Sequence, residues 1–154
     1  VALGVIGGSG AYDLLNNGGL GEKVNTVTLK TPFGDSAPIH HFRTGNLHYL
    51  FLSRHGEKDY SITAPFVNYR ANIYALKECG VERIISWSGP GIINTSFKPG
   101  DYVLPSDIID ETRNRETTFF KNSGIGFIRQ GEPFCPQIKH PKTTPHAQRR
   151  RGCS

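Results

Sequence analysis

The 154-residue sequence predicts an α/β fold in which a mixed, twisted sheet is flanked by helices. The apolar run Val1–Ile6 stops at a glycine-rich segment, which is typical of a buried strand followed by a tight turn. Apolar residues in Pro65–Cys79 recur at helical spacing, and a second apolar run, Val81–Trp87, follows directly. A strand, a long helix and another strand in succession are the pattern of an α/β domain.

The segment between the first strand and the long helix predicts further strands. Val24–Leu29 alternates Val24, Thr26 and Thr28 with Asn25, Val27 and Leu29, which is the period of a strand. Thr31–Asp35 contains Pro and Gly and indicates a turn. Ile39–Phe42 and Leu47–Leu52, joined by Arg43–Asn46, are predicted to form a hairpin.

The long helix carries signals at both ends. Pro65 suits the first turn, and Gly80 suits the left-handed position after the last turn. Its apolar face is predicted to consist of Phe66, Tyr69, Ile73, Leu76 and Cys79. Two further short strands are expected at Tyr102–Leu104 and Ile108–Ile109.

The charge distribution divides the chain into residues 1–138 and residues 139–154. The first part carries 13 basic and 13 acidic side chains, so the formal charge of +5 comes entirely from the last sixteen residues. We expect those to form a solvated, disordered tail, because they contain almost no apolar side chain to bury. A neutral body argues against nucleic acid as a partner. No apolar run reaches the length of a membrane span, and the start lacks a basic signal region, so a cytoplasmic location is expected.

The cysteines and histidines give no metal or disulfide pattern. Cys79, Cys135 and Cys153 are odd in number and include no Cys-x-x-Cys pair, which favours reduced thiols. The histidines at 40, 41, 48 and 55 lack the helical spacing of a metal site. The acidic residues Asp107, Asp110 and Glu111 are interpreted as a solvated turn.

Polar or glycine-rich segments follow three of the predicted strands. Gly7–Gly10, with Ser9, can form a backbone nest for an anion, although a plain tight turn fits equally well. Arg54 and His55 offer charge-assisted donors, but a surface arginine and a structural histidine are the alternative. Ser88–Gly91 follows a third strand. Since ligands of open α/β sheets bind at the carboxyl ends of strands, the three segments together predict an anion site.

Six motifs follow one another along about residues 2–138: Gly4–Gly10, Thr31–Gly34, Arg54–Gly56, Val67–Lys77, Pro99–Asp101 and Pro133–Pro136. Together, and in this order, they resemble the methylthioadenosine phosphorylase branch of the purine nucleoside phosphorylases. The resemblance implies phosphorolysis, in which inorganic phosphate displaces a purine from C1′ of a ribose. It also implies a nucleoside phosphorylase-like sheet. No cofactor and no metal are expected, and inorganic phosphate would be the co-substrate.

The resemblance assigns roles to particular residues. Ser9, Arg54, His55 and Ser88 would bind phosphate, and Gly89 would lie along the substrate. The intact enzyme would be a homotrimer in which Phe127 reaches the 5′ pocket of a neighbouring subunit. 5′-Methylthioadenosine is the favoured nucleoside, and a 6-oxopurine nucleoside is the alternative.

The sequence departs from the family pattern in two segments and in length. Glu57–Ser61 stands where the family has a histidine near the ribose, and Trp87–Asn94 replaces a stretch of small residues after the phosphate-binding Ser or Thr. Family members are nearly twice as long, so the resemblance suggests a truncated, N-terminal half with a basic or out-of-frame tail. The acid that protonates the base would lie in the other half, which leaves the catalytic residue unassigned. We therefore expect no phosphorolysis from these 154 residues alone, and a non-catalytic fragment that binds phosphate is the alternative of another class.

Overall fold

The computed structural model describes residues 3–124, 126, 129 and 131–139. Contacts within the chain divide it into two units, residues 1–91 with 113–124, and residues 92–112 with 125–154. The first unit holds every strand among the described residues. The described part of the second unit consists of turns and the short helix α3 (Pro136–Lys139).

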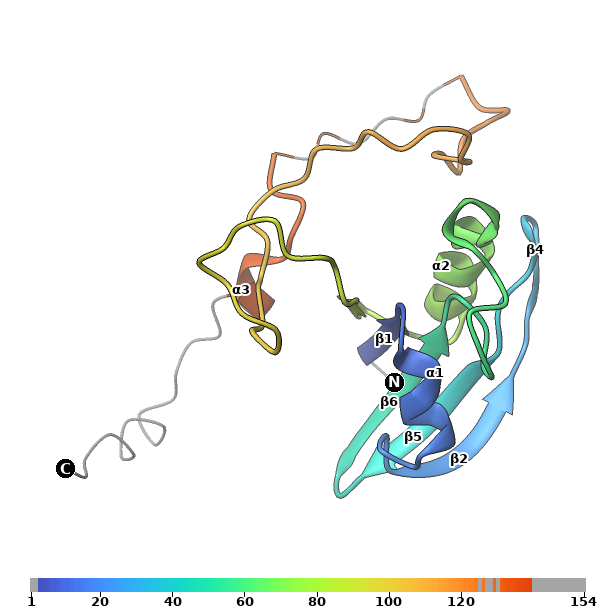
Figure 1. Ribbon diagram of the computed structural model, residues 1–154. Helices are drawn as coiled ribbons and strands as arrows, with labels where there is room; N and C mark the ends of the chain where they lie inside the picture. The colour runs from blue at the N-terminus through green and yellow to red at the C-terminus, as the bar shows by residue number, and fades with distance from the viewer. Residues whose placement is uncertain (1–2, 125, 127–128, 130, 140–154) are drawn as a thin grey trace. The chain divides into compact units, whose positions relative to one another are not determined.

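Five strands form a mixed sheet in the order β2-β5-β6-β1-β7 (Figure 1). β1 is parallel to both of its neighbours, β6 and β7, whereas β5 is antiparallel to β2 and to β6. A separate two-stranded ribbon pairs β3 with β4. The bounds are β1 Leu3–Gly7, β2 Glu22–Val27, β3 Lys30–Thr31, β4 Gly34–Asp35, β5 Ile39–Thr44, β6 Leu47–Ser53 and β7 Arg83–Trp87. The predicted mixed sheet with flanking helices is confirmed.

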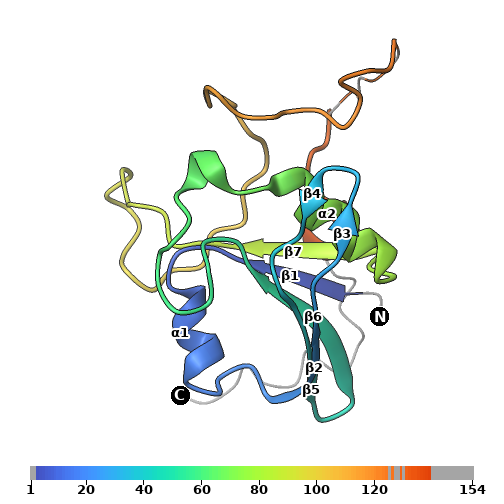
Figure 2. The same ribbon diagram turned by 90° about the vertical axis from the view of Figure 1, so that its right-hand side faces the viewer.

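One helix packs on each face of this sheet (Figure 2). α2 (Tyr69–Glu78) brings Ala75 and Leu76 against apolar residues of β5 and β6. α1 (Ala11–Asn16), which was not predicted, brings Ala11 against three aromatic side chains on the other face, Phe42, Tyr49 and Phe51. The two cores therefore hold β1 and β6, the strands that lead to the predicted anion site, from both sides.

The predicted start of the long helix and part of its apolar face are wrong. Pro65 lies in a separate 3-10 turn, Ala64–Phe66, and α2 begins only at Tyr69. Asn68 caps α2, since its side-chain oxygen accepts a hydrogen bond from the backbone N–H of Ala71 at 3.2 Å. Phe66 is consequently 81% exposed and does not join the core. The end is as predicted, because Gly80 follows the helix with φ 80°.

The strand predictions hold for the centre of the sheet and fail towards its margins. β2 occupies 22–27 instead of 24–29, and a bulge between Lys23 and Asn25 interrupts its alternation. β7 begins at Arg83 rather than Val81. The strands expected at 102–104 and 108–109 do not form. Tyr102 and Ile109 are about nine-tenths exposed, and a strand needs a hydrogen-bonded neighbour that these segments lack among the described residues.

Candidate functional site

The register of the three parallel strands brings the predicted anion-binding segments together. The last residue of β1, Gly7, pairs with Ser53 of β6 on one side and with Trp87 of β7 on the other. The residues that follow are Gly8, Arg54 and Ser88, so these three positions leave the sheet side by side. The backbone N–H of Arg54 donates to the carbonyl of Gly7 at 3.1 Å, and that of Gly8 donates to Trp87 at 2.7 Å.

A glycine is required at position 8 because the end of β7 passes close to it. A Cβ atom placed on Gly8 would lie 2.7 Å from the Ser88 hydroxyl oxygen and 3.0 Å from the Trp87 carbonyl oxygen. Both distances are shorter than ordinary van der Waals contact. The absence of a side chain at this position therefore allows the Ser88 hydroxyl to reach the turn after β1.

Arg54 links the ends of β6 and β7. A terminal nitrogen of its guanidinium, Nη2, lies 3.4 Å from the Ser88 hydroxyl oxygen, at the long limit of a hydrogen bond. The side chain is only partly buried. A planar cation beside a hydroxyl group and a glycine turn supplies the donors that a tetrahedral anion requires.

His55 lies beneath Arg54 and is 1% exposed. Its Nε2 accepts a hydrogen bond from the Nε of Arg54 at 2.9 Å, and its Nδ1 is 2.8 Å from the carbonyl oxygen of Ile62. The ring of Tyr60 stacks on the imidazole with a centroid distance of 4.2 Å. The sequence did not predict Tyr60 or the Ile62 carbonyl as partners of His55. No local sequence pattern identifies a backbone carbonyl that contacts a side chain seven residues before it.

The remaining predicted residues are less constrained. Ser9 is exposed in the turn after β1. Gly89 is exposed as well, and a side chain there would meet open space. The structure thus brings Ser9, Arg54, His55, Ser88 and Gly89 to one edge of the sheet. Phe127 lies outside the described residues.

A second buried histidine lies in β5, outside the predicted anion-binding segments. His40 is buried between the Thr26 hydroxyl, 2.8 Å from its Nδ1, and a Glu57 oxygen at its Nε2, and so ties β2 and β5 to the segment after β6. No group of three or more His, Cys, Asp or Glu side chains that could hold a metal ion occurs in the part of the chain that the structure describes.

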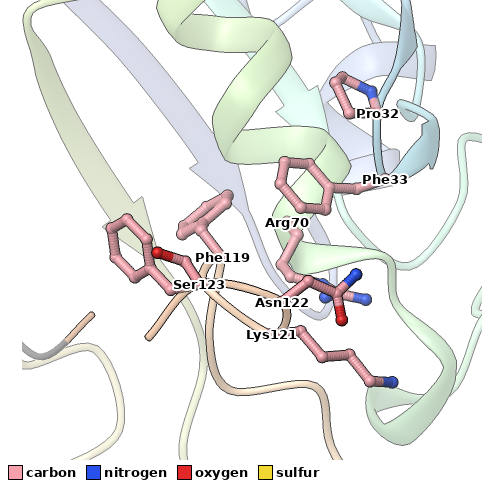
Figure 3. A pocket seen from close by; sticks show the side chains of 8 residues that line it. Pro32, Phe33, Arg70, Phe119, Lys121, Asn122 and Ser123 are labelled. Atoms are coloured by element: carbon pink, nitrogen blue, oxygen red, sulfur yellow. The ribbon is translucent and has the colours of Figure 1, made fainter. Parts of the chain in front are cut away.

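A cavity of about 510 Å³ lies away from the strand ends, beside the N-terminal turn of α2 (Figure 3). Arg70 lies over the ring of Phe33 at 5.1 Å in its wall, and Phe33 meets Phe119 edge to face. The Arg70 charge is matched by Glu116 at 3.4 Å. None of the predicted site residues lines this cavity, whose lining is Pro32, Phe33, Arg70, Phe119, Phe120, Lys121, Asn122 and Ser123.

The sequence matches one family model, that of the phosphorylase superfamily, over residues 2–146. An S-methyl-5′-thioadenosine phosphorylase of Thermococcus kodakarensis is 38% identical over 138 residues, which are 89% of this chain and 51% of the relative. A 6-oxopurine nucleoside phosphorylase of Pyrococcus furiosus is 40% identical over 144 residues, 89% of this chain and 52% of the relative.

Solved structures agree with these matches. The methylthioadenosine phosphorylase of Schistosoma mansoni superposes with a TM-score of 0.80 at 32% identity, over 90% of this chain and 50% of that structure. The chain therefore spans about half the length of the relatives that it matches.

Proposed function

We propose, because the chain belongs to the phosphorylase superfamily, that the converging ends of β1, β6 and β7 bind inorganic phosphate for the phosphorolysis of a purine nucleoside. The observation that carries the proposal is the in-register ending of these strands, which sets Gly8, Arg54 and Ser88 side by side. The phosphate-binding residues would be Ser9, Arg54, His55 and Ser88, and Gly89 would lie along the substrate.

The geometry supports a role in positioning and charge stabilisation. The Arg54 guanidinium and the Ser88 hydroxyl offer donors within 3.4 Å of each other, and Ser9 adds an exposed hydroxyl at the neighbouring turn. Phosphate held by these groups would be aimed at C1′ of a ribose whose bond to the purine is breaking. Fixed donors around the anion lower the barrier because they need no rearrangement while phosphate forms its bond to C1′ and the electron pair of the breaking C–N bond leaves with the purine.

5′-Methylthioadenosine is the favoured nucleoside because the relatives include S-methyl-5′-thioadenosine phosphorylases at 38–41% identity. A 6-oxopurine nucleoside is the second candidate, since a relative at 40% identity carries that name. The residues that would choose between the two bases are not among those at the strand ends. A homotrimer in the cytoplasm, with Phe127 in a neighbour's 5′ pocket, completes the proposal and rests on the family resemblance. Because the homotrimer is proposed for the intact enzyme, sedimentation of residues 1–138 joined to the other half of a full-length relative tests the oligomeric state.

The phosphate site is tested by calorimetric titration of the 154-residue chain with inorganic phosphate. We expect one site, which Arg54→Ala weakens about 10- to 100-fold, the effect of removing a charged hydrogen-bond donor from an anion. Arg83→Ala is the matched control, because Arg83 is an exposed arginine at the opposite end of β7. No detectable binding, or equal binding by Arg54→Ala, contradicts the proposal.

The role of the strand ends in phosphorolysis is tested in a hybrid enzyme. Residues 1–138 would replace the corresponding half of the Thermococcus kodakarensis relative, and the release of adenine from methylthioadenosine or of hypoxanthine from inosine would be followed by chromatography. We expect phosphate-dependent release of adenine that Arg54→Ala abolishes. An active hybrid that retains its phosphate dependence after Arg54→Ala refutes the assignment of Arg54.

A further inference from the structure

Both ring nitrogens of His55 are committed to partners inside the protein. A carbonyl oxygen accepts hydrogen bonds only, so the Nδ1 atom that faces Ile62 at 2.8 Å carries a proton. The Nε2 atom receives the Nε–H of Arg54 at 2.9 Å, and it can accept only when it carries no proton. The neutral ring with its proton on Nδ1 satisfies both contacts at once. A second proton, on Nε2, would make this atom a donor facing the Arg54 Nε–H donor and would place a positive imidazolium beside the positive guanidinium.

The segment between residues 56 and 62 holds this imidazole in place. Ile62 pairs with His55 twice, since its backbone N–H donates to the His55 carbonyl at 2.9 Å while its carbonyl receives the Nδ1 proton. The Ser61 hydroxyl donates to the same His55 carbonyl. Gly56 has φ 113°, and a Cβ there would overlap the Ser61 hydroxyl, so glycine is required for the segment to fold back this closely.

Tyr60 closes the outer side of the imidazole. Its ring lies nearly parallel to the His55 ring, with an interplanar angle of 25°, and the tyrosine is itself 43% exposed. Water is thereby kept from a histidine that is 1% exposed although it adjoins an open site. Tyr60 lies in Glu57–Ser61, the stretch in which this sequence departs from the family pattern.

The consequence for Arg54 is a fixed guanidinium plane. With Nε bonded to His55, the two terminal nitrogens are the donors left to face the strand ends, and Nη2 lies towards Ser88. The guanidinium is planar, so fixing one nitrogen and the direction of a second fixes the whole fork. An arginine held in this way loses less rotational freedom when an anion binds.

We propose that His55 is a positioning residue for Arg54, held as a neutral acceptor by Tyr60 and Ile62, and that it donates no hydrogen bond to the anion. The inference rests on the proposed phosphate site and refines the part that His55 plays in it. Tyr60 thereby becomes a determinant of phosphate affinity that touches neither phosphate nor Arg54.

The first test compares two substitutions of Tyr60 by calorimetric titration with inorganic phosphate. Tyr60→Phe keeps the stacked ring, and we expect phosphate affinity within about twofold of wild type. Tyr60→Ala removes the ring, and we expect about 3- to 10-fold weaker binding. Tyr102→Ala is the matched control, because Tyr102 is an exposed tyrosine at 90%. Unchanged binding by Tyr60→Ala overturns the proposal.

The second test reads the imidazole directly and needs no variant. Nitrogen NMR of histidine-labelled chain reports which ring nitrogen carries the proton, with and without phosphate. We expect His55 to keep an unprotonated Nε2 and a protonated Nδ1 in both states. Protonation of Nε2 when phosphate binds would make His55 a direct donor and overturn the proposal. Wild-type chain that binds no phosphate refutes the proposed function instead, and the NMR of the free chain still tests how His55 is held.

Discussion

Gly8→Ala is expected to separate the end of β7 from the end of β1. The new methyl group would lie 2.7 Å from the Ser88 hydroxyl oxygen, 3.0 Å from the Ser88 Cβ and 3.0 Å from the Trp87 carbonyl oxygen. The last of these atoms belongs to the backbone and accepts the Gly8 N–H at 2.7 Å, so β7 itself must shift. Overpacking of this kind lowers the free energy of unfolding by about 1–3 kcal/mol.

The larger effect is expected on phosphate affinity. Displacing the Ser88 hydroxyl removes one hydrogen-bond donor from the site and takes away a partner of Arg54. Losing one hydrogen bond to a charged group weakens the free energy of phosphate binding by about 1.5–3 kcal/mol. This corresponds to a dissociation constant about 10- to 100-fold higher.

Urea denaturation and calorimetric titration of the same preparations measure the two effects. Gly124→Ala is the matched control, since a side chain at Gly124 meets open space, φ there is not in the left-handed region and the residue lies outside the predicted anion-binding segments. We expect the control to unfold and bind phosphate like the wild type. A Gly8→Ala chain that binds phosphate with wild-type affinity would refute the reasoning, because Ser88 would then not need its place beside the turn after β1.

Three further outcomes follow from the packing. Asn68→Ala removes the cap of α2 and should lower the free energy of unfolding in urea by about 1–2 kcal/mol; an unchanged midpoint contradicts the capping role. Leu76→Ala opens the core under α2 and should cost about 2–5 kcal/mol, whereas Leu47→Ala, at a 52% exposed position, should cost far less. Burial, with a smaller contribution from the charge of Glu78, raises the pKa of the Cys79 thiol, so at pH 8 iodoacetamide should modify Cys79 more slowly than the exposed Cys135 in peptide mapping, with the difference narrowing as the pH rises. Equal rates of modification of Cys79 and Cys135 at pH 8 would contradict the raised pKa of the Cys79 thiol.

The centre of the sheet could be predicted because its residues satisfy local and tertiary demands together. Leu3–Ile6 and Tyr49–Leu52 are mostly apolar because α1 and α2 cover the two faces of the sheet at β1 and β6, and the neighbouring turns contain the glycines that the backbone needs. Parallel strands that end in register place the residues after them side by side. The sequence therefore predicted the meeting of Arg54 and Ser88 without any long-range contact being known.

The failures occur where tertiary contacts override the local pattern. The apolar spacing that includes Phe66 places the predicted start of the helix before Asn68. In the structure α2 starts after Asn68, because its side chain caps the helix by accepting from the Ala71 N–H and also donates to the Phe33 carbonyl. The apolar residues of 102–109 have strand-like composition without a strand to pair with among the described residues. The partners of His55 come from the Ile62 carbonyl and the Tyr60 ring, which only the folded loop brings close.

Within the described residues, no helix is long and apolar enough to cross a bilayer. The proposed phosphate site would use Arg54, hydroxyl groups and backbone N–H groups, all of which lie in the first unit.

The proposed site binds one anion where β1, β6 and β7 end. At 17.0 kDa the chain suits a proton–nitrogen NMR titration with inorganic phosphate, which reports each backbone amide separately. We expect the amide resonances of Gly8, Ser9, Arg54, Ser88 and Gly89 to shift with a single dissociation constant. Resonances that do not move, or shifts confined to other parts of the chain such as the cavity beside Arg70, would contradict it.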